Sequence, residues 1–132
     1  MNVIKGEITN IKVDGCLSLV GINVGDTRFS VIIIDTPETV SYLKTGNLIK
    51  VIFKETEVIV GKGAKHHISL QNKLIGRVIS IESGKLLSKV IIETAAGRIV
   101  SVITTNAVNQ LGIEEGSEVT AMIKTNEIML AE

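Results

Sequence analysis

The sequence predicts an all-β fold made of two small five-stranded barrels in tandem, each with one short helix. Three observations support this prediction. The chain of 132 residues is 45% hydrophobic but has only three aromatic side chains, so Ile, Val and Leu must fill the core. Short apolar runs alternate with Gly, Asn and Asp turn signals. The chain also matches itself at an offset near 70 residues, which is typical of a duplicated unit.

The first copy, residues 1–61, contains five apolar runs that predict strands. These runs cover residues 3–13, 17–24, 29–34, 48–53 and 58–60. A helix is expected to begin at Thr36, because Pro37 suits the first helical position and Glu38 complements the helix dipole. Five strands and one short helix in so few residues are typical of a barrel of the OB type.

Residues 62–68 predict a flexible, polar linker. His66 and His67 are adjacent, but neighbouring side chains on an extended chain point to opposite faces. No Cys, Asp or Glu stands beside them at ligand spacing, so we expect solvated histidines and no metal site.

The second copy, residues 69–132, repeats this order. Its strands are expected at 74–81, 87–93, 98–103, 119–123 and 128–130. Thr104 or Thr105 can cap a short helix, and Gly112 supplies the left-handed residue that ends it. The two copies align at an offset of 70 near their ends, whereas in the middle the offset slips to 68 and places Thr36 on Thr104.

The helix start of the second copy has parts suited to a small anion. Thr104 offers a hydroxyl beside a helix N-terminus, and Lys124 arrives at the end of a neighbouring strand. The alternative is that Thr104 is only a helix cap and Lys124 only a surface charge.

Composition argues against several classes of protein. Lysine plus arginine equal aspartate plus glutamate, 14 each, so no global field attracts nucleic acid or anionic lipid. No apolar run is long enough to span a membrane, and the first residues lack the apolar stretch of a signal peptide. Cys16 is the only cysteine, which excludes an intrachain disulfide and favours a cytoplasmic setting. No catalytic constellation stands at recognisable spacing, so an enzyme is not expected.

Residues 69–130 resemble the molybdate-binding Mop domain, also called the TOBE domain, and the first half resembles it more distantly. The likeness is carried by the residues SLQNKLIG at 69–76, the Ala107–Leu111–Gly112–Ile113–Gly116 helix and turn, and Met122–Ile123–Lys124. The resemblance implies a tandem protein that binds molybdate or tungstate at subunit interfaces of a homo-oligomer, such as a dimer or trimer. High apolar content on a short chain also fits burial between subunits.

The resemblance also implies a set of oxyanion ligands in this sequence. They are the Ser69 hydroxyl, the Leu70 backbone, Gln71, Thr104, the backbone near Ala107, Lys124 and Thr125. Gln71 replaces the arginine that the family usually has, so one full charge is lost while an amide donor stays. In the first copy Thr36 and Lys54 match Thr104 and Lys124, but the serine motif has no counterpart. Sites are therefore expected between copies or between chains.

The expected role is storage, buffering or delivery of the oxyanion inside the cell. One alternative is an oxyanion-sensing regulatory or assembly module that acts through a partner protein. A second alternative is a nucleic-acid-binding OB domain, which the neutral charge and the scarcity of aromatic side chains disfavour.

Overall fold

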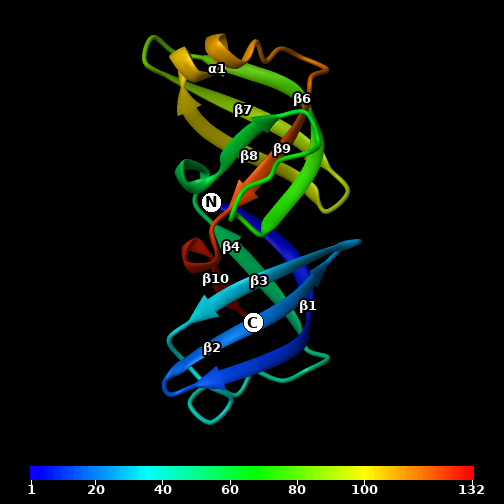
Figure 1. Ribbon diagram of the computed structural model, residues 1–132, viewed down its shortest axis with the longest axis vertical. Coiled ribbons are helices and arrows are strands. Elements are labelled where there is room, and N and C mark those ends of the chain that lie inside the picture. The colour runs from blue at the N-terminus through cyan, green and yellow to red at the C-terminus, as the bar shows by residue number, and fades with distance from the viewer.

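Ten strands form two five-stranded antiparallel sheets in the computed structural model, which describes residues 1–132 (Figure 1). The strands are β1 (Asn2–Asp14), β2 (Leu17–Val24), β3 (Thr27–Ile33), β4 (Leu48–Phe53), β5 (Ile59–Lys62), β6 (Asn72–Ser83), β7 (Leu87–Thr94), β8 (Gly97–Thr104), β9 (Glu118–Ile123) and β10 (Met129–Ala131). The helical segments are α1 (Thr105–Leu111) and two 3-10 turns, η1 (Glu55–Glu57) and η2 (Thr125–Glu127). Each sheet curls into a barrel, and the two barrels stack along the long axis of the molecule. The predicted fold class and all ten predicted strands are confirmed, whereas the two 3-10 turns were not predicted.

The two halves of the chain exchange their last strands. The sheet orders are β10-β4-β1-β2-β3 and β5-β9-β6-β7-β8. Strand β5 leaves the first half and pairs with β9, while β10 leaves the second half and pairs with β4. The boundaries 1–61, 62–68 and 69–132 stay a prediction for the repeats in the sequence. In space, each barrel takes one strand from the other half.

The offset between the two barrels is 70 residues along all their strands. Ser18 pairs with Ile33 as Ser88 pairs with Ile103, and both long first strands carry a bulge at equivalent places. The expected slip to an offset of 68 is therefore wrong for the third strand. The residue equivalent to Thr104 is Ile34, and Thr36 lies two residues further on.

Only the second barrel has the expected helix. Thr104 caps α1, and Gly112 ends it in the left-handed conformation at φ 64° and ψ 36°. The helix expected at Thr36 is wrong, because residues 34–47 form turns. The Thr39 and Val40 amides both donate to the Thr36 carbonyl, at 2.9 and 3.0 Å, so a single turn forms.

The turn at Thr36 does not extend because local side chains compete with the helical backbone. The Thr39 hydroxyl accepts a hydrogen bond from the Thr36 amide at 2.8 Å, and β-branched residues at 36, 39 and 40 have low helix propensity. None of the helices has the length and apolar character needed to cross a bilayer.

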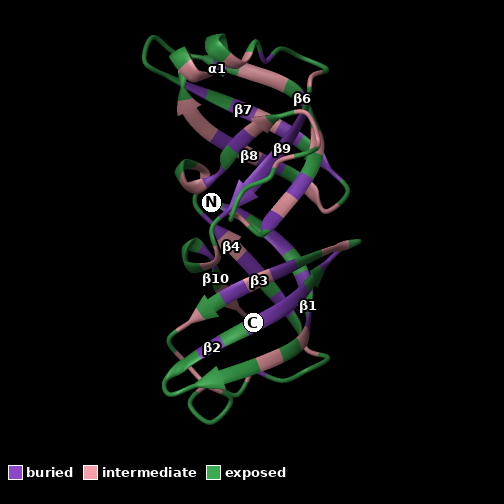
Figure 2. Ribbon diagram, viewed as in Figure 1, coloured by how far each residue is buried: buried purple, intermediate pink, exposed green.

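One hydrophobic core runs through both barrels (Figure 2). Buried and exposed residues alternate along β1, so that Ile4 and Ile8 point inward. Phe29 and Phe53 are fully buried in the first barrel, and the second barrel places Ile99 and Ile123 at the equivalent positions. Both barrels are thus filled mainly by aliphatic side chains, as the composition predicts.

Candidate anion-binding site

The first group of expected ligands meets between the two barrels, at a region that we call the waist. The waist comprises the starts of β1 and β6, the ends of β4 and β9, and the turns η1 and η2 (Figure 1). Asn72 at the start of β6 pairs with Ile123 at the end of β9. Gln71 directly precedes Asn72, and Lys124 directly follows Ile123, so the Gln71 end of the segment 69–71 adjoins Lys124, which Thr125 follows.

On one side of the waist the unpaired ammonium group of Lys124 lies with several neutral donors. Ser69, Gln71 and Lys124 are exposed, and Leu70 and Thr125 are half-buried. Lys124 forms no ion pair, since the two ion pairs of the structure involve the Met1 amine and Arg98. The Lys124 carbonyl accepts a hydrogen bond from the Glu127 amide at 3.0 Å, which shapes η2. One ammonium group against a dianion leaves room for donors from elsewhere.

Lys54 occupies the equivalent place on the other side of the waist. It follows β4 as Lys124 follows β9, and its carbonyl accepts from the Glu57 amide at 3.0 Å, as in η2. Glu55 stands where the second barrel has Thr125. The Glu55 carboxylate, which pairs with the Met1 amine at 3.6 Å, replaces a hydroxyl that could donate to an anion, so this side of the waist offers one donor fewer than the Lys124 side.

Thr104 and Ala107 lie at the far end of the second barrel. Thr104 pairs with Leu87, which is level with the end of β6, whereas Lys124 is level with its start. These levels are separated by roughly 35 Å of extended chain. The Ala107 amide donates to the Thr104 hydroxyl at 3.0 Å, so the cap itself uses this amide. One chain therefore does not bring Thr104 and Lys124 to the same anion.

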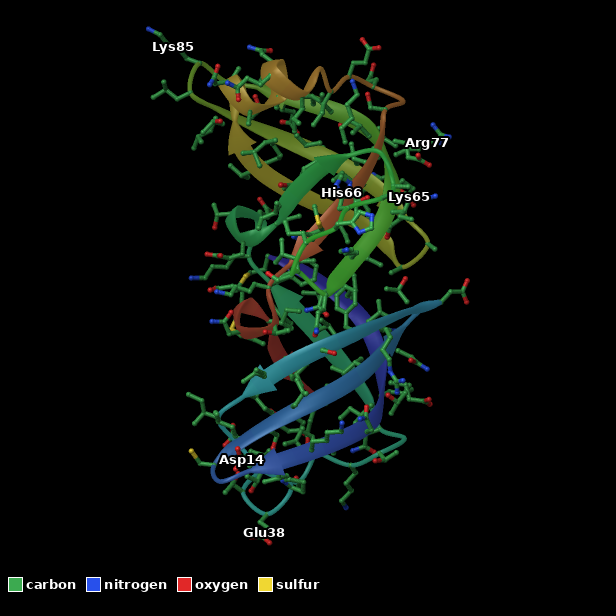
Figure 3. The ribbon with its side chains drawn as sticks, viewed as in Figure 1. Asp14, Glu38, Lys65, His66, Arg77 and Lys85 are labelled. Carbon is green, nitrogen blue, oxygen red and sulfur yellow. The ribbon has the colours of Figure 1, made fainter.

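Thr36 lies two residues before Glu38, which Figure 3 labels at the opposite tip of the molecule. It lines a hollow of about 390 Å³ together with Val13, Gly15, Pro37 and Glu38. The Glu38 carboxylate opposes an anion there. The neighbouring Asp35 affects Tyr42. Burial chiefly raises the pKa of Tyr42, and the carboxylates of Asp35 and Glu132 raise it further.

The linker is more ordered than its composition predicts. Lys62 belongs to β5, and the Gly63 carbonyl accepts from the buried Thr120 hydroxyl at 2.7 Å. His66 is half-buried against Gly61, so the expectation of a solvated side chain is wrong for this histidine, whereas His67 is exposed. A Cβ at position 61 would lie 2.6 Å from the His66 ring, so a larger residue there would force this ring to move.

Two buried asparagines at the waist, Asn2 and Asn72, were not predicted from the sequence. The Ser30 amide donates to Asn72 Oδ1 at 2.7 Å, and Asn72 Nδ2 donates back to the Ser30 carbonyl at 2.9 Å. Asn2 makes the same pair of bonds with Val100, both at 2.8 Å. The sequence does carry a signal for this pair. Asn2 and Asn72 are separated by the same 70 residues as the two barrels, and each begins a strand rich in apolar residues.

An apolar surface covers the outside of the first barrel. We call it the apolar face, and it consists of Val13, Leu17, Leu19, Ile32 and Ile34 on β1 to β3 and just beyond, all exposed. Four of these residues line a shallow hollow of about 270 Å³. The second barrel has Ser83, Leu87, Lys89, Val102 and Thr104 at the equivalent positions. Such a contiguous exposed apolar surface is typical of an interaction site.

Comparison with known proteins identifies the family. The TOBE domain matches residues 68–130. Molybdenum-pterin-binding protein 1 of Clostridium pasteurianum is 39% identical over 64 residues, which cover 48% of this chain and 94% of that protein. Molybdenum-pterin-binding protein MopB of Rhodobacter capsulatus is 31% identical over 91 residues, 67% of this chain and 34% of that protein.

A solved structure is similar over almost the whole chain. It is the cytoplasmic molybdate-binding protein ModG with molybdate bound, which is 25% identical with a TM-score of 0.90 and covers 98% of this chain and 94% of its own. Sequence likeness in the second half and structural likeness across both halves agree. The chain therefore belongs to the TOBE-domain family of molybdenum-pterin-binding proteins, and it carries two copies of the unit.

Proposed function

We propose that this protein binds molybdate or tungstate and stores, buffers or delivers it in the cytoplasm. The observation that carries this proposal is the likeness to molybdate-bound ModG over 98% of the chain. The chemistry of the waist supports it, since hydroxyl and amide dipoles beside one ammonium group suit a compact oxyanion. The relatives are named as binding proteins, and the proposal assigns no catalytic step.

The oxyanion is held between chains as well as within one chain. The donors of the waist and those at Thr104 and Ala107 lie at opposite ends of one barrel. A site that uses both groups requires the far end of a second chain against the waist of the first. A dianion needs more hydrogen-bond donors than Lys124 and the neutral groups of one waist provide, and the second chain supplies them.

The apolar face of the first barrel provides the contact between copies. Leu19 and Ile32 are directly opposed on neighbouring strands, and each is 39% exposed in the single chain. Leu19→Lys gives the first barrel the residue that the second barrel has at position 89. We expect this variant to fold and to be monomeric by mass measurement in solution, whereas the unchanged protein is a dimer or trimer. An unchanged mass would exclude the apolar face as the contact.

Calorimetric titration with molybdate, tungstate and sulfate tests the function. The three dianions carry the same charge, so a preference for the larger molybdate and tungstate must come from the size of the cavity. We expect binding of molybdate or tungstate with little binding of sulfate. A folded protein that gives no binding heat with either metal oxyanion, and crystals without heavy-atom density after soaking, would refute the proposal.

A further inference from the structure

The two buried asparagines act as joints between the barrels. The strands β3 and β8 each lie at one edge of their sheet, and each of these edges receives one asparagine side chain from the other barrel. Asn72 is fully buried, and Asn2 is 5% exposed. A side-chain amide that both accepts and donates reproduces the pairing of a neighbouring strand at one residue. Each joint thus gives a partner to the amide and the carbonyl of one half-buried residue, Ser30 or Val100.

Asn72 is fixed on two sides at once. Its main chain pairs with Ile123 on β9, and its side chain pairs with Ser30 on β3 of the other barrel. The turn η2 also packs against β3. The first residue of β6 is therefore held beside Lys124 by both barrels.

The segment Ser69–Gln71 depends on this anchor. No residue of the segment forms a hydrogen bond within the chain. Its position is set at one end by Asn72 and at the other by the linker, where the Lys73 ammonium donates to the His66 carbonyl at 2.7 Å. Loss of the Asn72 joint would release the end of the segment that adjoins Lys124.

We propose that Asn72 is a positioning residue that sets the oxyanion affinity of the waist by fixing Ser69–Gln71 beside Lys124. This inference rests on the proposed function. Asn72 does not contact the oxyanion; it determines whether the hydroxyl and amide donors are already in place when the anion arrives. Preorganised donors bind more tightly because less ordering is required on binding.

Asn2 provides a matched control within the same molecule. It makes the same two hydrogen bonds at the equivalent joint, with similar burial. All three donors of the 69–71 segment lie on the Asn72 side. Asn72→Ala and Asn2→Ala therefore remove equal structural interactions, and only the first releases the donor segment.

The test compares the two variants in three measurements. Thermal unfolding is expected to show similar losses, because each variant leaves two backbone groups unpaired. Hydrogen exchange is expected to show faster exchange of the Ser30 amide in Asn72→Ala and of the Val100 amide in Asn2→Ala. For molybdate binding measured well below the unfolding temperature, we expect Asn72→Ala to lose affinity by about tenfold or more, as when a partner that orients a ligand is removed. The molybdate affinity of Asn2→Ala is expected to stay within about twofold of that of the unchanged protein, because distant substitutions that do not interact with a site change its energetics by no more than this.

The outcomes separate this inference from the function on which it rests. Equal losses of affinity in the two variants, or an unchanged affinity in Asn72→Ala, would overturn the role of Asn72 while the binding function stands. Absence of molybdate binding in the unchanged protein would overturn the function and this inference with it. If Asn72→Ala does not fold, Asn72→Gln and Asn2→Gln give the same comparison, because a longer side chain keeps the amide but displaces both bonds.

Discussion

Replacement of Lys124 by alanine tests the electrostatic part of the proposed site. Lys124 follows the last paired residue of β9, is exposed and forms no ion pair, so its ammonium group is available to an anion. It stands beside the 69–71 segment, which offers both a hydroxyl and a side-chain amide. Lys124→Ala is expected to leave the fold in place, because the lysine is exposed.

The size of the effect follows from the exposure of this lysine. Two unit charges about 4 Å apart interact by about 1 kcal/mol where water screens them, and by about 4 kcal/mol near an effective dielectric constant of about 20. Because Lys124 is exposed, its interaction with one negative charge is close to the lower value of about 1 kcal/mol. A dianion carries two such charges, which doubles the interaction energy. A loss of about 2 kcal/mol corresponds to an affinity about 30-fold weaker.

Calorimetric titration with molybdate measures this change, with Lys50→Ala as the control. Lys50 is also an exposed lysine on a strand, but no candidate ligand stands beside it. We expect a weaker affinity only in Lys124→Ala, and a smaller difference at high ionic strength. Equal affinities in Lys124→Ala and the unchanged protein would remove Lys124 from the site. Equal losses in both variants would mean that only the net charge matters.

Three further changes have expected outcomes. Gln71→Arg restores a charged donor. Charge-assisted hydrogen bonds are stronger than neutral ones by about 1 kcal/mol, so the molybdate affinity measured by calorimetry should rise about fivefold. An unchanged affinity would show that Gln71 faces away from the anion. Tyr42 is the only tyrosine and there is no tryptophan, so phenolate absorbance reports its titration alone. Because its pKa is raised in the folded state, the folded protein keeps the proton to higher pH than the unfolded chain does, so the contribution of Tyr42 to the free energy of unfolding should be constant below about pH 10 and fall above it. Asp35→Asn should lower the pKa of Tyr42, and an unchanged titration would contradict this coupling. Lys5 stands directly opposite Lys50 on neighbouring strands, where two like charges repel each other. Lys50→Thr removes this repulsion and should raise the free energy of unfolding, measured by urea titration, by about 0.2–1 kcal/mol. A decrease would show that the two charges are separated.

The strands and the second-barrel helix were predictable because their signals are local. Apolar runs bounded by turn residues locate the ten strands, and the Thr104 cap and Gly112 stop bound α1. The helix expected at Thr36 failed for a reason that is also local but finely balanced. Pro37 and Glu38 favour a helix start, while the Thr39 hydroxyl and β-branched neighbours favour a single turn.

The site was predictable only as a set of residues. Family likeness supplies Ser69, Gln71, Thr104 and Lys124, and nothing in their spacing tells that two of these groups lie at opposite ends of a barrel. Strand register decides that separation, since it fixes Lys124 level with the start of β6 and Thr104 level with its end.

The sequence by itself determined the duplicated unit, its aliphatic core and the positions of its strands, because periodicity and turn chemistry act over a few neighbouring residues. Only the tertiary structure decided which barrel each last strand joins. Residues 59–62 and 129–131 are short apolar strands that could pair with either sheet. The choice depends on edge strands, on the two asparagine joints and on a shared core, all of which join residues far apart in the chain.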